Sequence, residues 1–187
     1  MDTDIKNALR VLRNGGTVLY PSDTIWGIGC DATNIEAVKN VYKIKNRNES
    51  KSMIVLLDDA GWLANYIEKV PDIAFDLIEL SEKPLTIIYP NAKNVAKNLV
   101  ASDGTIGIRI TRDEFCKKLI SQFRKPLVST SANYSNQNAP ANFDEIDQDI
   151  INAVDYVVEW RQNDLNRNSP SGIIKIGVNN EIQVIRN

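Results

Sequence analysis

Residues 105–133, TIGIRITRDEFCKKLISQFRKPLVSTSAN, contain two β-rich runs with a helical segment between them. Residues 105–110 and 127–130 are mostly apolar or β-branched, which predicts two strands. Residues 112–123 are predicted to form a helix, and Lys125-Pro126 separates it from the second strand. Strands that are apolar on both faces are typical of a sheet covered by helices. This stretch therefore predicts an α/β fold.

The same alternation of elements extends to both ends of the chain. A first helix is expected with Asp4 as its N-cap and with Gly15-Gly16 as its stop. Residues 21–31 are expected to be a loop that begins at Pro21. We expect further helices near residues 38–42, 62–67, 73–80, 91–100 and 143–153, and further strands at 17–20, 53–57, 85–89, 156–159, 173–176 and 182–185.

Composition places the chain among folded proteins without a membrane span. It has 187 residues, 43% of them hydrophobic and 25% charged, which fits one domain of residues 1–187. The apolar run at residues 53–57 is about a quarter of the roughly 20 residues that cross a bilayer. The acidic start Met1-Asp2-Thr3-Asp4 lacks the pattern of a secretion signal. We expect a cytoplasmic protein in which Cys30 and Cys116 are core residues.

The absence of histidine narrows the possible chemistry. With no histidine in the sequence, Ser-His-Asp and Cys-His nucleophile systems, HExxH zinc sites and the usual general base are all excluded. The net charge of −2 and the pI near 5.3 argue against nucleic-acid binding by the molecule as a whole. Only a local basic patch could bind nucleic acid.

Three sequence segments each allow a structural and a functional interpretation. Residues 27–32, GIGCDA, match the dinucleotide pattern G-x-G-x-x-A, but they start six residues after the strand, so glycines that allow close packing are favoured. The basic residues 43–51 form either a solvated turn or a polyphosphate site. Residues 127–133, LVSTSAN, form either a capped turn or a set of hydrogen-bonding groups for an anion.

In combination these segments resemble the YrdC-like family, over nearly the whole chain. The resemblance rests on residues 15–21 with Thr24 and Gly27, on Lys45-Asn46-Arg47 as K-x-R, on residues 105–109, and on the S-x-N of residues 129–133. Ser169-Pro170-Ser171 and Ile185-Arg186 also fit. The family implies a single YrdC-like domain with a twisted mixed sheet flanked by helices.

The TsaC-type members of that family are L-threonylcarbamoyladenylate synthases, and the resemblance implies their reaction. L-threonine, bicarbonate and ATP would be condensed to threonylcarbamoyl-AMP and pyrophosphate, with Mg²⁺ on the ATP phosphates and no metal site in the protein. Partner proteins would transfer the threonylcarbamoyl group to an adenosine of tRNA.

The resemblance also implies roles for residues of this chain. Contacts with ATP are expected from Arg47, Lys51, Thr105, Ser131, Ala139 and Arg186. Lys45 and Asn133 complete the catalytic K-x-R and S-x-N elements with Arg47 and Ser131. Contacts with threonine are expected from Thr24, Arg109, Ser129 and Ser171, and Arg109 is the natural partner of the threonine carboxylate.

The chain departs from the family pattern at several positions, and two alternatives follow. Asn48 stands where proline is frequent, Leu56 where many members have a histidine, and residues 81–84, SEKP, where the family has Trp-Pro-Gly-Pro. The first alternative is a paralogue of the YciO kind without the synthase activity. The second is a non-catalytic module that binds RNA weakly through the basic loop.

Overall fold

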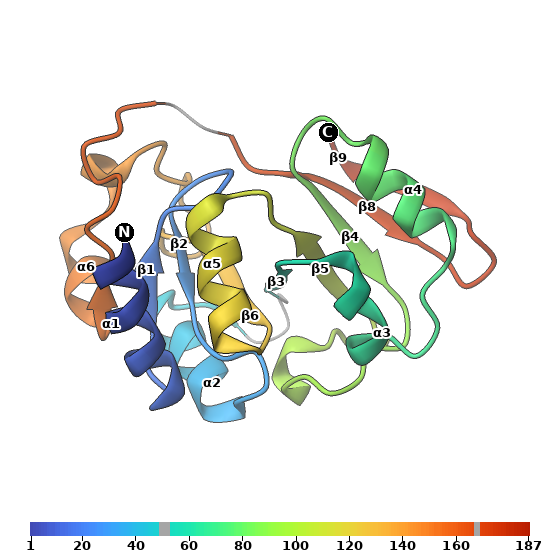
Figure 1. Ribbon diagram of the computed structural model, residues 1–187, viewed down its shortest axis with the longest axis horizontal. Coiled ribbons are helices and arrows are strands. Elements are labelled where there is room, and N and C mark those ends of the chain that lie inside the picture. Colours follow the sequence, from blue (N-terminus) through green and yellow to red (C-terminus); the bar gives the residue numbers. More distant parts are fainter. Residues whose placement is uncertain (49–52, 167–168) are drawn as a thin grey trace.

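The computed structural model describes residues 1–48, 53–166 and 169–187, and a single mixed sheet runs through them (Figure 1). Its nine described strands have the order β7-β1-β2-β6-β3-β5-β4-β8-β9. The pairs β1–β7, β3–β5 and β4–β8 are parallel, and the other neighbours are antiparallel. The strands are β1 Val18–Tyr20, β2 Gly27–Gly29, β3 Ile54–Leu57, β4 Leu85–Tyr89, β5 Ile106–Ile110, β6 Leu127–Ser131, β7 Tyr156–Val157, β8 Gly172–Ile176 and β9 Ile182–Arg186.

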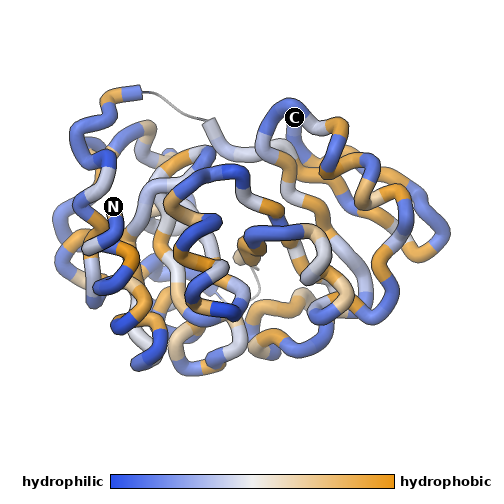
Figure 2. The backbone as a smooth tube through the Cα atoms, viewed as in Figure 1, coloured by the Kyte–Doolittle hydropathy of each residue, from blue (hydrophilic) through white to orange (hydrophobic). Residues whose placement is uncertain are grey.

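Helices flank this sheet, which confirms the predicted α/β class. They are α1 Asp2–Arg13, α2 Ile35–Ile44, α3 Leu63–Tyr66, α4 Ile73–Leu80, α5 Glu114–Phe123 and α6 Gln148–Ala153, with short 3₁₀ turns η1 Ala60–Trp62, η2 Lys97–Leu99 and η3 Phe143–Glu145. Helices α1 and α5 pack against each other and against the sheet (Figure 1). Apolar and polar residues alternate along both helices (Figure 2), because one side of each helix is buried.

The predicted N-cap of the first helix was wrong. Helix α1 already begins at Asp2, and Asp4 is buried within its first turn. The Asp4 carboxylate accepts a hydrogen bond from the Tyr156 hydroxyl at 2.8 Å and another from the Glu159 amide at 2.9 Å. Asp4 therefore joins the helix to the distant β7 segment, a role that local sequence does not reveal.

Two predicted helices are shorter than expected. Residues 91–100 contain only the turn η2, and residues 143–153 divide into η3 and α6. Asp147 separates the second pair because its side chain caps α6 by accepting from the Asp149 amide.

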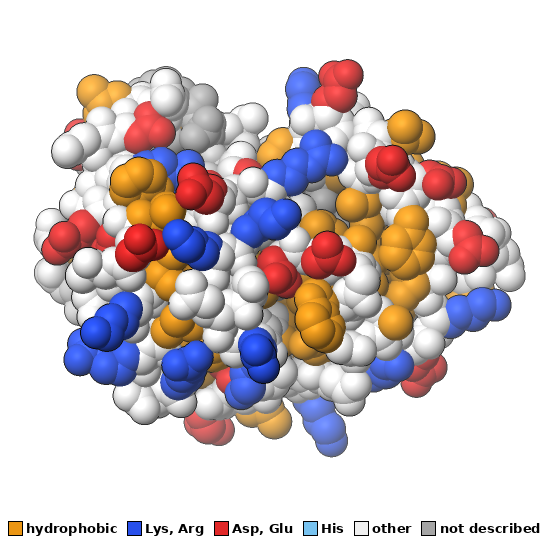
Figure 3. All heavy atoms as spheres, viewed as in Figure 1, with side chains coloured by type: hydrophobic (Ala, Val, Ile, Leu, Met, Phe, Trp, Pro, Cys, Tyr) orange, Lys and Arg blue, Asp and Glu red, His pale blue; other side chains and the backbone are white. Residues whose placement is uncertain are grey.

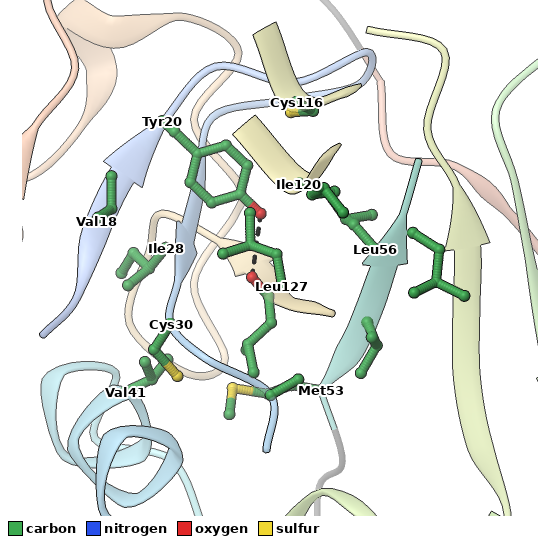
Figure 4. Packing of buried hydrophobic residues seen from close by; sticks show 14 of the residues in the cluster. Val18, Tyr20, Ile28, Cys30, Val41, Met53, Leu56, Cys116, Ile120 and Leu127 are labelled. Carbon is green, nitrogen blue, oxygen red and sulfur yellow. Dashed lines mark hydrogen bonds between the residues drawn. The ribbon is translucent and has the colours of Figure 1, made fainter. Parts of the chain in front are cut away.

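The predicted loop at residues 21–31 was also wrong, because it contains strand β2. Gly27 and Gly29 lie within this strand, between β1 and β6, so they do not form a dinucleotide-binding turn. A side chain at Gly29 would begin 2.3 Å from the Val128 carbonyl oxygen and 2.7 Å from the Tyr20 ring. The Tyr20 hydroxyl donates to that same Val128 oxygen at 3.1 Å (Figure 4). The close-packing interpretation of the glycines is confirmed.

The hydrophobic core lies between the helices and the sheet. Tyr20, Ile28, Leu56 and Leu127 are fully buried there, and Figure 4 shows them around the centre of the sheet. Cys30 and Cys116 are both buried free thiols, as predicted. Among the described residues, no helix combines the length and the apolar character needed to cross a bilayer.

Gly29→Ala is expected to lower the free energy of unfolding by about 2–3 kcal/mol, because the added methyl group clashes with backbone and ring atoms. The matched control is Gly172→Ala, whose methyl group would lie 3.6 Å from its nearest neighbour. Urea unfolding followed by circular dichroism measures both values. Equal stability of the two variants would contradict the tight packing of β2.

Candidate functional site

One cavity of about 290 Å³ collects most of the residues that the sequence singled out. It is lined by Thr24, Ile25, Trp26, Gly27, Arg47, Met53, Ile54, Arg109, Ser129, Thr130, Ser131, Asn133, Gln137, Ala139, Pro170, Ser171, Ile173 and Arg186. These residues come from segments spread over the entire length of the chain. The cavity therefore exists only in the folded protein.

The register of the sheet aligns the polar residues of the cavity. Ser131 pairs with Gly27 on β2, and Ser129 pairs with Ile54 on β3. Because side chains two residues apart in a strand point to the same face, both serines face the same side of β6. Gly27 leaves room beside Ser129, whose hydroxyl would lie 3.4 Å from an added Cβ.

Lys45 joins the K-x-R and S-x-N segments at one end of the cavity. This residue is the C-cap of α2, and only 1% of its surface is exposed. Its Nζ donates to the carbonyl oxygen of Ser131 and, at 2.6 Å, to that of Asn133. The Lys45 carbonyl accepts from the Ser135 amide at 3.0 Å. The K-x-R and S-x-N segments are thereby held against each other.

Arg47 lies two residues after Lys45 and lines the cavity. Asn46 takes a left-handed conformation with φ 47°, which asparagine tolerates better than most residues, and the chain turns there. The Arg47 amide then donates to the Tyr42 carbonyl at 2.9 Å. Partial burial lowers the pKa of Arg47. Arg47 and Ser131 line one shared cavity, as the polyphosphate interpretation of the basic segment requires.

The environment of Lys45 alters its protonation. Burial first, and the nearby Arg47 second, lower the pKa of Lys45 to about 7. A neutral lysine amine keeps two N–H donors, which match its two carbonyl acceptors. The link between the two motifs therefore persists in both protonation states, and an arriving anion would favour the charged form.

Arg109 lines the other end of the cavity, and only 3% of its surface is exposed. Its Nη1 donates to the Thr24 hydroxyl at 3.2 Å, and its Nη2 lies 3.0 Å from Asp23 Oδ1. The contact with Asp23 is close enough for an ion pair but lacks hydrogen-bond geometry. Asp23 also accepts from the Thr111 hydroxyl and the Arg112 amide. The sequence alone assigns no role to Asp23, because only the fold brings it to Arg109.

Ser171 and Arg186 complete this end of the cavity. The Ser171 hydroxyl lies 2.8 Å from that of Thr86, and the Ser171 carbonyl accepts from Arg186 Nε at 3.0 Å and Nη2 at 2.7 Å. Burial, and then the nearby Arg109, lower the pKa of Arg186. Arg186 and Pro170 also line an adjacent cavity of about 560 Å³, so the cleft continues beyond Arg186.

Two cavity residues retain unused hydrogen-bonding groups. Asn133 donates from Nδ2 to the carbonyls of Tyr134 and Gln137, but its buried Oδ1 has no hydrogen-bond partner among the described residues. Arg109 Nε is likewise buried and without such a partner in the described structure. Because buried polar groups are rarely left unsatisfied, these atoms indicate a site for a polar ligand.

The structure brings together nine of the predicted site residues. They are Thr24, Arg47, Arg109, Ser129, Ser131, Asn133, Ala139, Ser171 and Arg186. Lys45 supports the cavity wall without being among the lining residues. Thr105 does not line the cavity, and its hydroxyl donates to Asp103 at 2.6 Å. Lys51 lies outside the described residues.

The apolar part of the cavity was not predicted from the sequence. Trp26, Met53, Ile54 and Ile173 line it, and the Trp26 ring packs 4.8 Å from that of Phe143. Trp26 directly precedes the Gly27 of the recognised motif, which was the one available signal. Among the described residues, no group of three or more His, Cys, Asp or Glu side chains could hold a metal ion.

The fold and the cavity define a mixed-sheet α/β protein with a cationic, hydroxyl-lined binding site. The Sua5/yciO/yrdC family, described as "Telomere recombination", matches residues 10–187, and the chain belongs to this family. A threonylcarbamoyl-AMP synthase of Pseudoalteromonas translucida is 34% identical over 95% of both chains. A putative threonylcarbamoyl-AMP synthase of Methanocaldococcus jannaschii is 36% identical over 87% of this chain and 75% of that protein.

Solved structures share this fold. E. coli YciO superposes with a TM-score of 0.86 at 22% identity, covering 100% of this chain and 90% of that one. P. abyssi Sua5 complexed with L-threonine superposes with a TM-score of 0.82 at 22% identity and covers 92% of this chain. The present chain spans 50% of that Sua5 chain.

Lys45→Met is expected to lower the free energy of unfolding by about 1–3 kcal/mol, because two backbone carbonyls lose their donor. The matched control is Lys43→Met, an exposed position two residues earlier. Urea unfolding compares the two variants. If both unfold at the wild-type denaturant concentration, Lys45 does not hold the motifs together.

Proposed function

We propose that this protein is an enzyme, a threonylcarbamoyl-AMP synthase that joins L-threonine, bicarbonate and ATP and releases pyrophosphate. The observation that carries the proposal is the single cavity in which Arg47, Ser131 and Asn133 lie together with Arg109, Thr24 and Ser171. One end is cationic and suits a triphosphate. The other is a buried arginine with hydroxyl groups and suits an amino acid.

The nucleotide would bind at the K-x-R and S-x-N end. Arg47 offers a fork of N–H donors to phosphate oxygens, and the serine hydroxyl and nearby backbone amides add further donors. Ala139 and Arg186 also line the cavity, and we propose that both contact the nucleotide, Arg186 from the Arg109 end. Magnesium would enter with the substrate on the phosphate oxygens and would neutralise part of their charge.

Threonine would bind at the Arg109 end. A carboxylate is the usual ligand of a buried arginine, and Arg109 Nε has no other hydrogen-bond partner among the described residues. Asp23 lies against Nη2 and the Thr24 hydroxyl accepts from Nη1, so the guanidinium is held in one orientation with Nε left for the ligand. Thr24, Ser129 and Ser171 would surround the amino acid.

The proposed reaction needs no nucleophile from the protein. The threonine amine and bicarbonate form a carbamate with loss of water, and a carbamate oxygen attacks the α-phosphorus of ATP as pyrophosphate leaves. The transferred group is adenylyl, so the enzyme would be a nucleotidyltransferase. The protein aligns the reactants and places cations where negative charge accumulates. Such catalysis is compatible with a chain that has no histidine.

The product is an activated mixed anhydride and must be consumed by an acyl acceptor. We propose that partner proteins transfer its threonylcarbamoyl group to a tRNA adenosine.

Purified protein incubated with ATP, Mg²⁺, bicarbonate and labelled threonine is expected to form a labelled adenylate that chromatography separates from threonine. Omission of any one substrate should abolish the product. A complete absence of threonine-dependent product would reject the proposal in favour of a paralogue without synthase activity.

Arg47→Ala is expected to lower the rate of product formation at least tenfold, about 1.4 kcal/mol of transition-state stabilisation, because a charge-assisted phosphate contact is lost. Steady-state kinetics measures this change. The matched control is Arg10→Ala on the outer surface of α1, which should retain the wild-type rate. An Arg47→Ala enzyme as fast as the control would place the nucleotide elsewhere.

ATP binding is expected to take up more than about half a proton at pH 7.5, because the triphosphate raises the pKa of Lys45 from about 7. ATP affinity should accordingly fall as the pH rises through this region. Calorimetry in two buffers of different ionisation enthalpy measures the uptake, and Lys45→Met should reduce it. Identical wild-type enthalpies in both buffers would contradict the linkage.

A further inference from the structure

Ser22 lies one layer behind the surface that a ligand in the main cavity meets. Thr24, Ile25 and Trp26 line that cavity, and they also line an adjoining cavity of about 20 Å³, to which Ser22 contributes. Ser22 itself does not line the main cavity. Both Ser22 and Thr24 are buried, with exposed fractions of 5% and 4%. Any effect of Ser22 on a ligand must therefore pass through a residue of the cavity wall.

The Ser22 hydroxyl takes part in three hydrogen bonds within this segment. Its oxygen lies 2.8 Å from the Ile25 carbonyl oxygen, 3.0 Å from the Thr24 hydroxyl oxygen and 3.2 Å from the Thr24 amide nitrogen. A carbonyl only accepts and an amide N–H only donates, so Ser22 donates to Ile25 and accepts from the Thr24 amide. Because a hydroxyl has a single hydrogen, the third bond has one possible direction. The Thr24 hydroxyl donates to Ser22.

This direction determines what the Thr24 hydroxyl can offer to the cavity. Its hydrogen points to Ser22, and one of its two lone pairs accepts from Arg109 Nη1 at 3.2 Å. The second lone pair has no donor among the described residues. Toward a ligand, Thr24 is therefore an acceptor only.

Contacts with α5 hold the backbone of this segment in place. Cys116 Sγ donates to the Pro21 carbonyl at 3.3 Å, and Arg161 Nη2 donates to the Ser22 carbonyl at 3.5 Å. Arg161 Nη2 also donates to Asp113 at 2.6 Å, and Asp113 caps α5 by accepting from the Cys116 amide at 2.9 Å. Arg161 keeps these contacts with a left-handed φ of 66°, which is uncommon for arginine. Ser22 is thereby fixed relative to Thr24.

We propose that Ser22 is a positioning residue, which orients the Thr24 hydroxyl to accept a hydrogen bond from the amine of the bound amino acid. The inference rests on the proposed function and adds the direction of the Thr24 contact and the residue that sets it. The substrate carboxylate is an acceptor and needs the N–H donors of Arg109. Thr24 offers an acceptor directly beside Arg109. The amine is the matching donor, since it is attached to the carbon next to the carboxylate, one carbon closer than the threonine hydroxyl.

This direction of the hydrogen bond suits the formation of the carbamate. The amine nitrogen uses its lone pair to form the new N–C bond with the carbon of bicarbonate, and water is lost. A hydroxyl that donated to the nitrogen would occupy this lone pair, whereas a hydroxyl that accepts from an N–H leaves it free. A group that is oriented in advance also needs no reorganisation when the substrate reacts.

Calorimetric titration with L-threonine tests the proposal on the wild type, Ser22→Ala, Ser22→Thr, Thr24→Val and the double variant Ser22→Ala/Thr24→Val. Ser22→Thr keeps the hydroxyl, and the adjoining cavity offers space for its methyl group. The matched control for the loss of a buried hydroxyl is Thr17→Val, because the Thr17 hydroxyl donates to Asp155 at 2.9 Å and does not line the cavity. A second ligand, L-2-aminobutanoate, has the amine but lacks the hydroxyl. Thermal melts, ATP titrations and the synthase assay run in parallel on all variants.

Ser22→Ala is expected to weaken threonine binding about fivefold, because the Thr24 hydroxyl is then free to turn its hydrogen toward the ligand. In the Thr24→Val background the same substitution should change the affinity by less than about twofold, since Ser22 acts through that hydroxyl. The affinity for L-2-aminobutanoate should fall by the same factor as that for threonine. Ser22→Thr and Thr17→Val should bind both amino acids as the wild type does, and ATP affinity should be unchanged throughout.

Three results would overturn the proposal. Equal threonine affinities of the wild type and Ser22→Ala would show that Ser22 does not orient Thr24. An equal loss of affinity with and without the Thr24 hydroxyl would give Ser22 a structural role only. A loss of affinity for threonine but not for L-2-aminobutanoate would place the substrate hydroxyl, rather than the amine, at Thr24.

The parallel synthase assay separates this inference from the proposed function. Product formation together with any of the three results would overturn the inference alone. The expected binding pattern without product formation would reject only the synthase. A wild-type protein that binds no threonine would overturn both.

Discussion

The buried side chain of Lys45 is the constraint on which the site depends. Its nitrogen contacts the carbonyls of Ser131 and Asn133, 86 and 88 residues further along the chain. These carbonyls lie where β6 ends, and Lys45 lies where α2 ends. The lysine thus holds the segment after α2 against the segment after β6, and together they form one wall of the cavity. Arg47 and Ser131 both line the cavity from this wall.

The rest of the site is held by polar contacts in a water-poor environment. Arg109 is fixed by Asp23 and Thr24, and Ser171 by Thr86 and Arg186. Hydrogen bonds and charges are stronger in such surroundings than in water, and groups fixed in advance need little reorganisation when a ligand binds. This arrangement suits a reaction whose substrates supply the attacking atom themselves.

Charge is distributed unevenly over this molecule, and the fold rather than the composition produces the pattern. Arg47, Arg109 and Arg186 line the cavity, with Lys45 supporting its wall, and the cations of α1 and α5 form a second group on the outer surface (Figure 3). The net charge of −2 shows neither of these two groups of cations. The average charge of a chain therefore says little about what any one of its surfaces binds.

The sequence by itself determined the elements whose signal is local. Helix α4 and strand β4 have the predicted bounds, because a periodic apolar pattern and flanking prolines suffice to define them. Local pattern left the basic segment and the Ser/Thr/Asn segment each with two interpretations, and the family resemblance identified them as the K-x-R and S-x-N segments. Strand β2 was missed because its three residues include two glycines, which have low strand propensity and are required there by the Tyr20 ring. Only the tertiary structure decided that Asp4 binds β7, that Asp23 pairs with Arg109 and that Thr105 lies outside the cavity, because these contacts join residues far apart in the sequence.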